Sequence, residues 1–141
     1  MAPSHRSFAA TVAEVTIASD GAIRVDRVVT ALHCGLAVNP DNVRAQIEGA
    51  TMFGLSVALH GEITFADGAA VQTNFDEYQV LRMNEAPKVE AHIVDSSEPP
   101  TGASETPMAP LAPAIANAIF AATGQRLTKL PLRLEPKGIT G

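Results

Sequence analysis

One carboxylate, Glu105, lies in the segment PPTGASETPMAP (99–110), among prolines and small residues and directly before an alanine-rich apolar run. Turns on both sides can hold such an acid at the mouth of a helix, where it can accept a proton from a reacting molecule. A loop acid that only keeps the loop hydrated is the alternative interpretation. The neighbouring residues alone do not decide between a general base and a loop acid.

A second polar side chain, Gln46, lies in the run AQIEGATMFG (45–54). An amide offers both N–H donors and a carbonyl acceptor, which suits a ligand that carries both kinds of group along one edge. An exposed position on a hydrated helix face is the alternative interpretation. Glu48 is four residues from Arg44, so these two are expected to form a structural ion pair on the same helix.

The histidines and the cysteine do not form a metal-binding pattern. The four histidines are widely spaced, and Cys34 is the single cysteine of the chain. Structural metal sites need closely spaced ligands, so no metal ligands are expected here, and Cys34 is expected to be a buried small apolar residue. No phosphate-binding loop, Ser-His-Asp order or dinucleotide fingerprint is present either.

Composition excludes several classes of protein. The 141 residues are enough for one domain with a modest core, and 46% hydrophobic residues exclude a disordered tail. The net charge of −5 comes without a basic cluster, and Trp is absent, so nucleic acid is not an expected partner. No stretch approaches the ~18 apolar residues of a membrane span. Charged residues make up only 18%, which favours a surface that meets a partner.

Two features of the sequence bear on the cellular location. A single cysteine cannot form an internal disulfide, and the segment Met1–Ala10 lacks the apolar region of a signal peptide. We therefore expect the cytoplasm, with the periplasm open if a partner chain carries an export signal for both.

The β-rich runs predict about five strands. Two runs surround Asp20-Gly21 within residues 8–31, and two more, 61–66 and 69–81, surround Asp67-Gly68; Asp-Gly is a strong hairpin signal. Residues 88–95 alternate as a further strand. The apolar positions expected to face the core of the first hairpin are Val12, Val15, Ile17, Ile23, Val25 and Val28.

Two helices are predicted between and after these strands. The first covers residues 39–61, with Asn39 as its cap and Pro40 at its first position, and its apolar positions are Val43, Ile47, Ala50, Gly54 and Val57. Gly49 and Gly54 each cost such a helix about 1 kcal/mol relative to Ala, which close packing or a ligand could explain. The second helix begins near Pro110 or Pro113 and ends at Gly124, with Leu111, Ile115 and Ile119 on one face.

These elements predict an α+β fold, in which two β-hairpins and a further strand pack with two main helices. The loop that carries Glu105 would then enter the second helix. No composition shift marks a boundary, so residues 1–141 are expected to form a single domain.

Most of the chain, from Ser7 to Leu132, also resembles a known family. The runs CGLAVNPDNVRAQIEGATMFGLSVAL (34–59) and DGAAVQTNFDEYQVLRMNEAPKVEAHIVDSSEPPTGASETPMAPLAPAIANAIFAATGQRL (67–127) carry the resemblance, in this order. They are similar to the C-terminal part of the molybdenum-binding subunit of the xanthine dehydrogenase/aldehyde oxidase family. Within it, the isoquinoline 1-oxidoreductase beta subunit and the bacterial aldehyde dehydrogenase large subunit are the most similar branch.

The resemblance assigns chemistry to the two polar side chains. The family's catalytic base lies in a Gly-Val-Gly-Glu-Pro-like loop and matches Glu105, which would accept a proton during substrate oxidation. The glutamine of the family's Gln-x-Glu-Gly motif contacts the pterin and matches Gln46. The backbone of Gly102, Ala103 and Ser104 is implied to donate hydrogen bonds toward this molybdopterin, expected in its cytosine dinucleotide form.

The sequence departs from the family pattern beside the acid. Ala103 and Ser104 stand where the family has Val-Gly, and Thr106 stands where it has Pro. Because glycine adopts a positive φ at little cost, Ser104 could strain the loop or crowd the cofactor. Reduced or altered activity is one expectation that follows.

The resemblance also implies an assembly. The chain would be a small subunit or fragment of a molybdenum hydroxylase that oxidises aldehydes or hydroxylates N-heterocycles with oxygen from water. Its expected partners are a larger molybdenum-subunit polypeptide and a subunit that carries iron–sulfur clusters. A non-catalytic module that acts in assembly or binding is the alternative. The exact substrate and the electron acceptor stay open.

Overall fold

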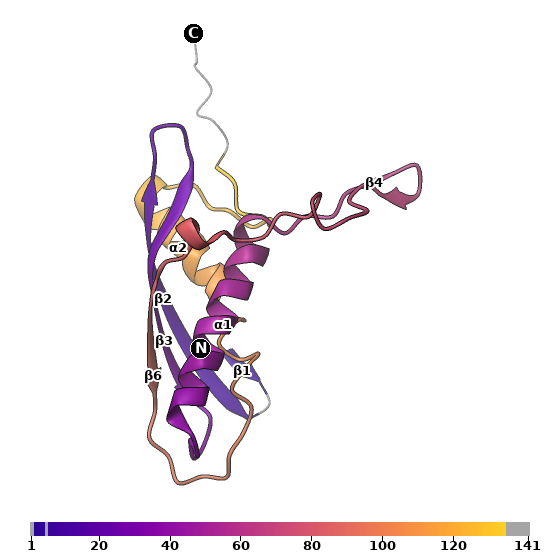
Figure 1. The fold of residues 1–141 in the computed structure, drawn as a ribbon. Coiled ribbons are helices and arrows are strands. Elements are labelled where there is room, and N and C mark those ends of the chain that lie inside the picture. Colours follow the sequence, from indigo (N-terminus) through magenta and orange to yellow (C-terminus); the bar gives the residue numbers. More distant parts are fainter. Residues whose placement is uncertain (1, 5, 135–141) are drawn as a thin grey trace.

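Four strands form the main sheet of the computed structural model, which describes residues 2–4 and 6–134. The strands are β1 (Ala2–Ser4), β2 (Ser7–Ile17), β3 (Ile23–His33) and β6 (Lys88–Ile93), and their order across the sheet is β1-β2-β3-β6 (Figure 1). β6 lies parallel to β3, whereas the other pairs are antiparallel. The predicted hairpin around Asp20-Gly21 and the strand after Lys88 are confirmed, and β1 is a strand that no pattern in the sequence predicted.

A β-bulge in β3 explains why its buried residues break the alternation expected of a strand. Val25 and Val28 are three residues apart and both are buried, because the register of β2 and β3 shifts so that Asp26 lies opposite no residue. The bulge reverses which side of the strand faces the core. On β2 the alternation is regular: Ala13, Val15 and Ile17 pack against the core, while Val12 lies on the other face and is 66% exposed. The prediction that Val12 faces the core is therefore wrong.

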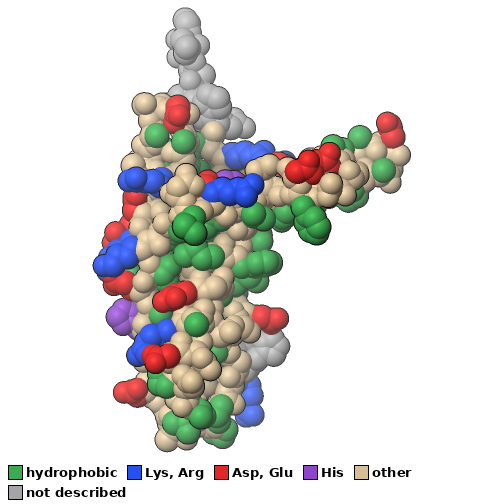
Figure 2. Space-filling view, in the orientation of Figure 1, with side chains coloured by type: hydrophobic (Ala, Val, Ile, Leu, Met, Phe, Trp, Pro, Cys, Tyr) green, Lys and Arg blue, Asp and Glu red, His purple; other side chains and the backbone are tan. Residues whose placement is uncertain are grey.

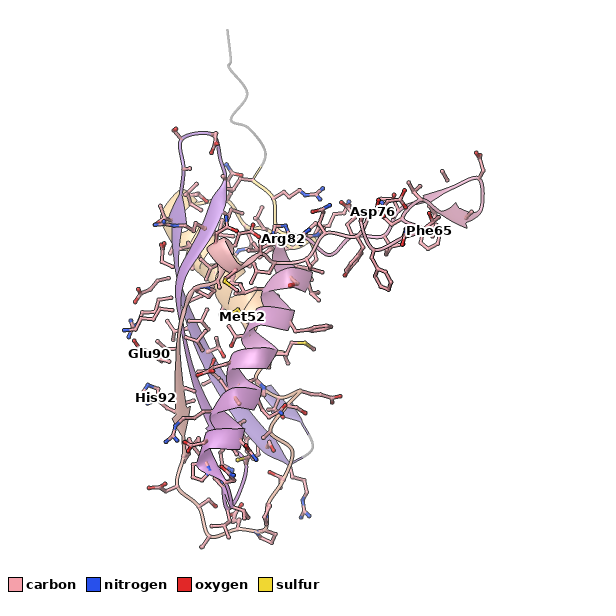
Figure 3. The ribbon with its side chains drawn as sticks, in the orientation of Figure 1. Met52, Phe65, Asp76, Arg82, Glu90 and His92 are labelled. Carbon is pink, nitrogen blue, oxygen red and sulfur yellow. The ribbon has the colours of Figure 1, made fainter. Side chains whose placement is uncertain are left out.

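Two helices cover one face of the sheet. α1 (Pro40–Leu59) contacts β6, α2 (Leu111–Thr123) contacts β2, and the helices contact each other (Figure 1). Glu90 and His92 on β6 point away from α1 (Figure 3). The core between the sheet and the helices is one cluster of buried side chains: Val25, Val28, Leu55, Ala58, Leu111, Ile115, Ile119 and Leu132. The α+β fold is thus confirmed.

The ends of both helices follow the predicted signals. The Asn39 side chain accepts a hydrogen bond from the Asn42 backbone N–H at 3.1 Å, and Gly124 ends α2 with φ 74°. The buried face of α1 differs from the prediction, because Val57 is partly exposed. It consists of Ile47, Thr51, Gly54, Leu55 and Ala58.

The Arg44 side chain pairs within the first turns of α1. It donates to Asp41 at 2.7 Å, and within the described part of the chain it forms no ion pair with Glu48. The predicted Arg44–Glu48 pair is therefore wrong. Asp41 is three residues from Arg44 and offers the same charge on the same helix face.

The second Asp-Gly hairpin is much shorter than predicted and lies outside the main sheet. Its strands are β4 (Phe65–Ala66) and β5 (Ala69–Ala70), and Asp67 and Gly68 both have positive φ. Residues 61–82, here called the arm, extend away from the body of the molecule (Figure 1). Leu81 at the base of the arm packs against the core, whereas Phe65, Val71 and Phe75 further out are exposed. The predicted long strand over 69–81 does not form, because these outer residues have no apolar surface to pack against.

Candidate functional site

The loop that carries Glu105, residues 94–110, runs from the end of β6 back across the ends of β3 and β2 to the start of α2. Two backbone hydrogen bonds tie it to the segment after β3. Leu36 N–H donates to the carbonyl oxygen of Glu98, and Thr101 N–H donates to that of Cys34, both at 2.9 Å. This loop, here called the Glu105 loop, is therefore anchored to the main sheet before it reaches the acid.

Gly35 makes this close approach possible. Its φ is 69°, and a Cβ atom placed on it would lie 2.2 Å from the carbonyl oxygen of Pro99. Any other residue would push the Glu105 loop away from the sheet. Sequence reasoning missed this residue, and its only signal was a glycine directly after a strand end.

Ser7 fixes the next part of the loop. Its buried hydroxyl donates a hydrogen bond to the carbonyl oxygen of Gly102 and lies 2.7 Å from the Thr101 hydroxyl. Because a serine has one hydroxyl proton, Thr101 is left to donate to Ser7. The start of β2 thus holds the loop three residues before Glu105, a contact that no local pattern in the sequence indicates.

Packed residues lie on both sides of Glu105, partly buried on one side and fully buried on the other. Ala103 packs against a small apolar cluster that includes Cys34 and Ile47, and Thr106 and Pro107 are buried. Met108 N–H donates to the carbonyl oxygen of Glu105 at 3.0 Å, which closes a turn at the acid. The Glu105 side chain itself is exposed. The loop thus presents the Glu105 carboxylate from a backbone that is held on both sides of it.

The departure from the family pattern at Ser104 does not strain the backbone. Among the described non-glycine residues, only Arg6 and Asp67 have positive φ, so Ser104 adopts a conformation open to any residue. Ser104 and Gly102 are both exposed. The expectation of strain at Ser104 is therefore wrong.

Gln46 lies on the exposed side of α1, close to the same apolar cluster. The next residue, Ile47, is buried in the cluster that Ala103 contacts, so the helix turn of Gln46 and the Glu105 loop share this support. One turn further, a Cβ placed on Gly49 would meet no atom within 4 Å. The helix surface beside Gln46 is therefore open. The interpretation of Gly49 as a closely packed position within this chain is wrong.

Cys34 is buried, as predicted. Burial raises the pKa of its thiol above the ordinary value, because the charged thiolate loses solvation. The thiol is thus a packing group beneath the Glu105 loop. Within residues 2–4 and 6–134, no three His, Cys, Asp or Glu residues lie together in a way that could hold a metal ion.

Neither helix of the described chain is both long enough and apolar enough to cross a membrane.

Comparison with known proteins identifies the family. Residues 2–87 match the model of a molybdopterin cofactor-binding domain. The chain is 36% identical over 132 residues to the beta subunit of isoquinoline 1-oxidoreductase from Brevundimonas diminuta, a match that covers 93% of this chain and 17% of that protein. It is also 36% identical to a nicotinate dehydrogenase subunit of Pseudomonas putida, over 92% of this chain and 11% of that protein.

A solved structure shares both fold and sequence with the chain. The aldehyde oxidoreductase from Desulfovibrio gigas superposes with a TM-score of 0.77 and 26% identity, over 89% of this chain and 14% of that one. The chain therefore spans less than a fifth of the length of these three relatives. Because the family model covers more than half of the sequence, we conclude that the chain belongs to the molybdopterin cofactor-binding domains of the xanthine dehydrogenase/aldehyde oxidase family.

Proposed function

We propose that residues 1–141 form one domain, the C-terminal portion of a molybdopterin-binding subunit, present as a separate small subunit or as a fragment. The complete enzyme would oxidise aldehydes or hydroxylate N-heterocycles with oxygen from water. The observation that carries this proposal is the exposed Glu105 carboxylate at a turn whose flanks are held by Ser7, Cys34 and buried Thr106. A loop acid that only binds water needs no such support.

The exposed groups of this surface fit one side of a molybdopterin. The Gln46 amide can donate to and accept from a pterin edge, and the open helix surface at Gly49 leaves room beside it. Backbone N–H groups of Gly102, Ala103 and Ser104 are the further groups that would hold the cofactor. The cytosine dinucleotide form is the one that the family resemblance implies. When bound, the cofactor supplies the metal centre that takes up electrons from the substrate.

Glu105 would act as the general base. A carboxylate accepts a proton efficiently when its oxygen lies within about 2.6–3.2 Å of the donor, and the turn at Glu105 limits the positions that the side chain can reach. Thr101 and Ser7 would act only by positioning this turn. Since both Glu105 and Gln46 are exposed, the remaining walls of the pocket must come from other segments.

The partners follow from the length of the relatives. The chain matches 17% of the isoquinoline 1-oxidoreductase relative and 11% of the nicotinate dehydrogenase relative. We infer a larger molybdenum-subunit polypeptide that completes the pocket and an iron–sulfur subunit that receives the electrons. The single cysteine is consistent with the cytoplasm, which stays a prediction.

A non-catalytic role in assembly is the second candidate. Ala103, Ser104 and Thr106 depart from the family pattern, which is the observation that favours it. The structure weakens this argument, because Ser104 has an unstrained backbone, Ala103 packs in an apolar cluster and Thr106 is buried. The three replacements are thus compatible with a loop of ordinary geometry.

Cofactor content tests the proposal. The chain is purified together with the polypeptides that bind it, and molybdenum and the fluorescence of oxidised pterin are measured. We expect molybdenum and pterin in the wild-type complex and less pterin in Gln46→Ala. Glu48→Ala, a change on the exposed side of the same helix, is the control and should keep the wild-type pterin content. A complete complex without molybdenum and pterin would refute the molybdopterin assignment.

A further inference from the structure

The arm and the exposed side of α1 carry large apolar side chains that the molecule does not cover. On the arm, Phe75 is 97% exposed, and on α1, Phe53 is 64% exposed. Figure 3 shows Phe65 near the tip of the arm, far from the core, and Figure 2 shows hydrophobic side chains along the arm and below its base. Exposed apolar surface of this extent is characteristic of a surface that meets another protein.

The outer part of the arm is shaped by its own hydrogen bonds, whereas its base is tied to the body by Leu81, which packs against the core, and by the ion pair of Glu62 with Arg133. Thr64 N–H donates to the Gln72 side chain at 2.8 Å, and the Glu77 carboxylate accepts from the backbone and the hydroxyl of Thr73. These hydrogen bonds lower the pKa of Glu77. A two-stranded hairpin is marginally stable in water by itself. The outer part of the arm is thus preshaped, and its exposed residues Phe65 and Phe75 lack the packing that would stabilise it.

The base of the arm forms a groove with α1. The groove is lined by Gly49, Met52 and Phe53 on the helix and by Val80, Arg82 and Met83 on the chain that leaves the arm. Leu81 N–H donates to the Ser56 hydroxyl at 3.1 Å, which fixes this chain segment to the helix. Residues 80–82 belong to the arm and also line the groove. One occupant can therefore contact both.

We propose that the arm and this groove are the docking surface for the remaining part of a molybdenum-binding subunit. The relatives are several times longer than this chain, so a large part of such a subunit must pack against the surface that the matching region leaves uncovered. A second copy of the chain is disfavoured, since each copy carries a net charge of −5. This inference rests on the proposed function and adds the place of contact.

The test uses a defined occupant and three variants. The chain is co-expressed with the beta subunit of isoquinoline 1-oxidoreductase from Brevundimonas diminuta, from which the matching 132 residues are deleted, and the complex is recovered through a tag on the chain. Phe53→Asp and Phe75→Asp should each reduce the recovered partner to about a tenth or less, as expected for aromatic residues at the centre of an interface. Val12→Asp is the control, because Val12 is 66% exposed and lies on β2, outside the arm and the groove. Circular dichroism checks that each variant is folded.

The outcomes of this experiment separate the docking surface from the proposed function. Loss of the partner in the Phe53 and Phe75 variants alone supports the docking surface. No recovered partner, equal loss in Val12→Asp, or self-association of the chain that Phe53→Asp disrupts would each overturn it. Recovery of the complex requires no metal, so a complex that forms through the arm but holds no molybdenum would refute the proposed function only. A complex with molybdenum that tolerates both Phe changes would refute the docking surface only.

Discussion

Gly54 on α1 and Leu111 at the start of α2 lie so close that a Cβ on Gly54 would come within 2.8 Å of Leu111 Cδ2 and 3.1 Å of Met108 Cγ. The two helices can therefore approach only because position 54 has no side chain. Met108 and Leu111 directly follow the turn at Glu105. The glycine thus determines how near the end of the Glu105 loop lies to the helix that carries Gln46.

Gly54→Ala should destabilise the chain, although alanine favours a helix. The change gains about 1 kcal/mol of helix propensity. The overlap with Leu111, which is buried and cannot move freely, costs about 1–3 kcal/mol. We expect a net loss of up to about 2 kcal/mol in the free energy of unfolding, measured by urea denaturation.

Gly49→Ala is the matched control on the same helix. A Cβ at Gly49 meets no atom within 4 Å, so only the propensity gain of about 1 kcal/mol remains. The chain should become more stable. Equal effects of Gly49→Ala and Gly54→Ala would show that the close packing of α1 and α2 is not what determines the stability of this helix.

Ser7→Ala should release the Glu105 loop. It removes the hydroxyl that contacts Thr101 and Gly102, and the loss of a hydrogen bond at such a partly buried position costs about 0.5–1.5 kcal/mol. Hydrogen exchange of residues 99–105 should become faster, since the opening of the loop becomes easier. Ser19→Ala, in the exposed turn before β3, is the control and should leave both quantities unchanged. Unchanged exchange in Ser7→Ala would show that the loop is held elsewhere.

The acid stability of the sheet should depend on Glu90. Hydrogen bonds from Arg27 and then from Lys88 lower the pKa of Glu90 from 4.5 to about 2. A lowered pKa in the folded state means that the charged carboxylate stabilises the fold above about pH 4.5 and that this contribution is lost as the pH falls toward about 2. Glu90→Gln should therefore be less stable than wild type near neutral pH.

Thermal unfolding between about pH 6 and about pH 2 checks this expectation. The difference between wild type and Glu90→Gln should shrink as the pH falls. Glu48→Gln, a change on the exposed side of α1, is the control that should follow the wild-type curve. A constant difference between wild type and Glu90→Gln across the whole range would contradict the role of the ion pair with Arg27, whose guanidinium lies 2.8 Å from Glu90.

Local signals in the sequence were sufficient to predict one hairpin, the start of one helix and the end of another. Asp20-Gly21 marks the hairpin of β2 and β3, Asn39 with Pro40 starts α1, and Gly124 ends α2. Each is a short-range preference of a few residues for one backbone conformation, so it can be read without knowing the rest of the fold.

Contacts between distant residues could not be predicted in this way. The hydrogen bond from Ser7 to Gly102 joins residues 95 positions apart, and the parallel pairing of β3 and β6 depends on the crossover through α1. The bulge at Asp26 and the short strands of the arm likewise depend on what each side chain packs against. The sequence could therefore place Glu105 in a loop before a helix, and only the structure shows what holds that loop.

Ser104→Gly tests the departure from the family pattern. Because Ser104 has no backbone strain, its replacement by glycine should leave the stability of the chain unchanged or lower it slightly through added freedom in the unfolded state. Turnover of the complete complex should stay within about twofold of wild type, because the Ser104 side chain is exposed. A large gain in turnover would instead show that the serine side chain crowds the cofactor.

Glu105→Gln tests the general base in the complete complex. The change is nearly isosteric and keeps the turn, whose hydrogen bond from Met108 involves only the backbone of residue 105, but it removes the group that accepts a proton. Folding and cofactor content should stay near wild type, while the rate falls by about 10²–10⁴-fold, mainly in kcat rather than in KM. Single-turnover reduction of the complex by an aromatic aldehyde or an N-heterocycle measures the rate directly, and Glu48→Gln serves as the matched control. If Glu105→Gln is reduced as fast as wild type, Glu105 is a hydrated surface residue and the catalytic proposal fails.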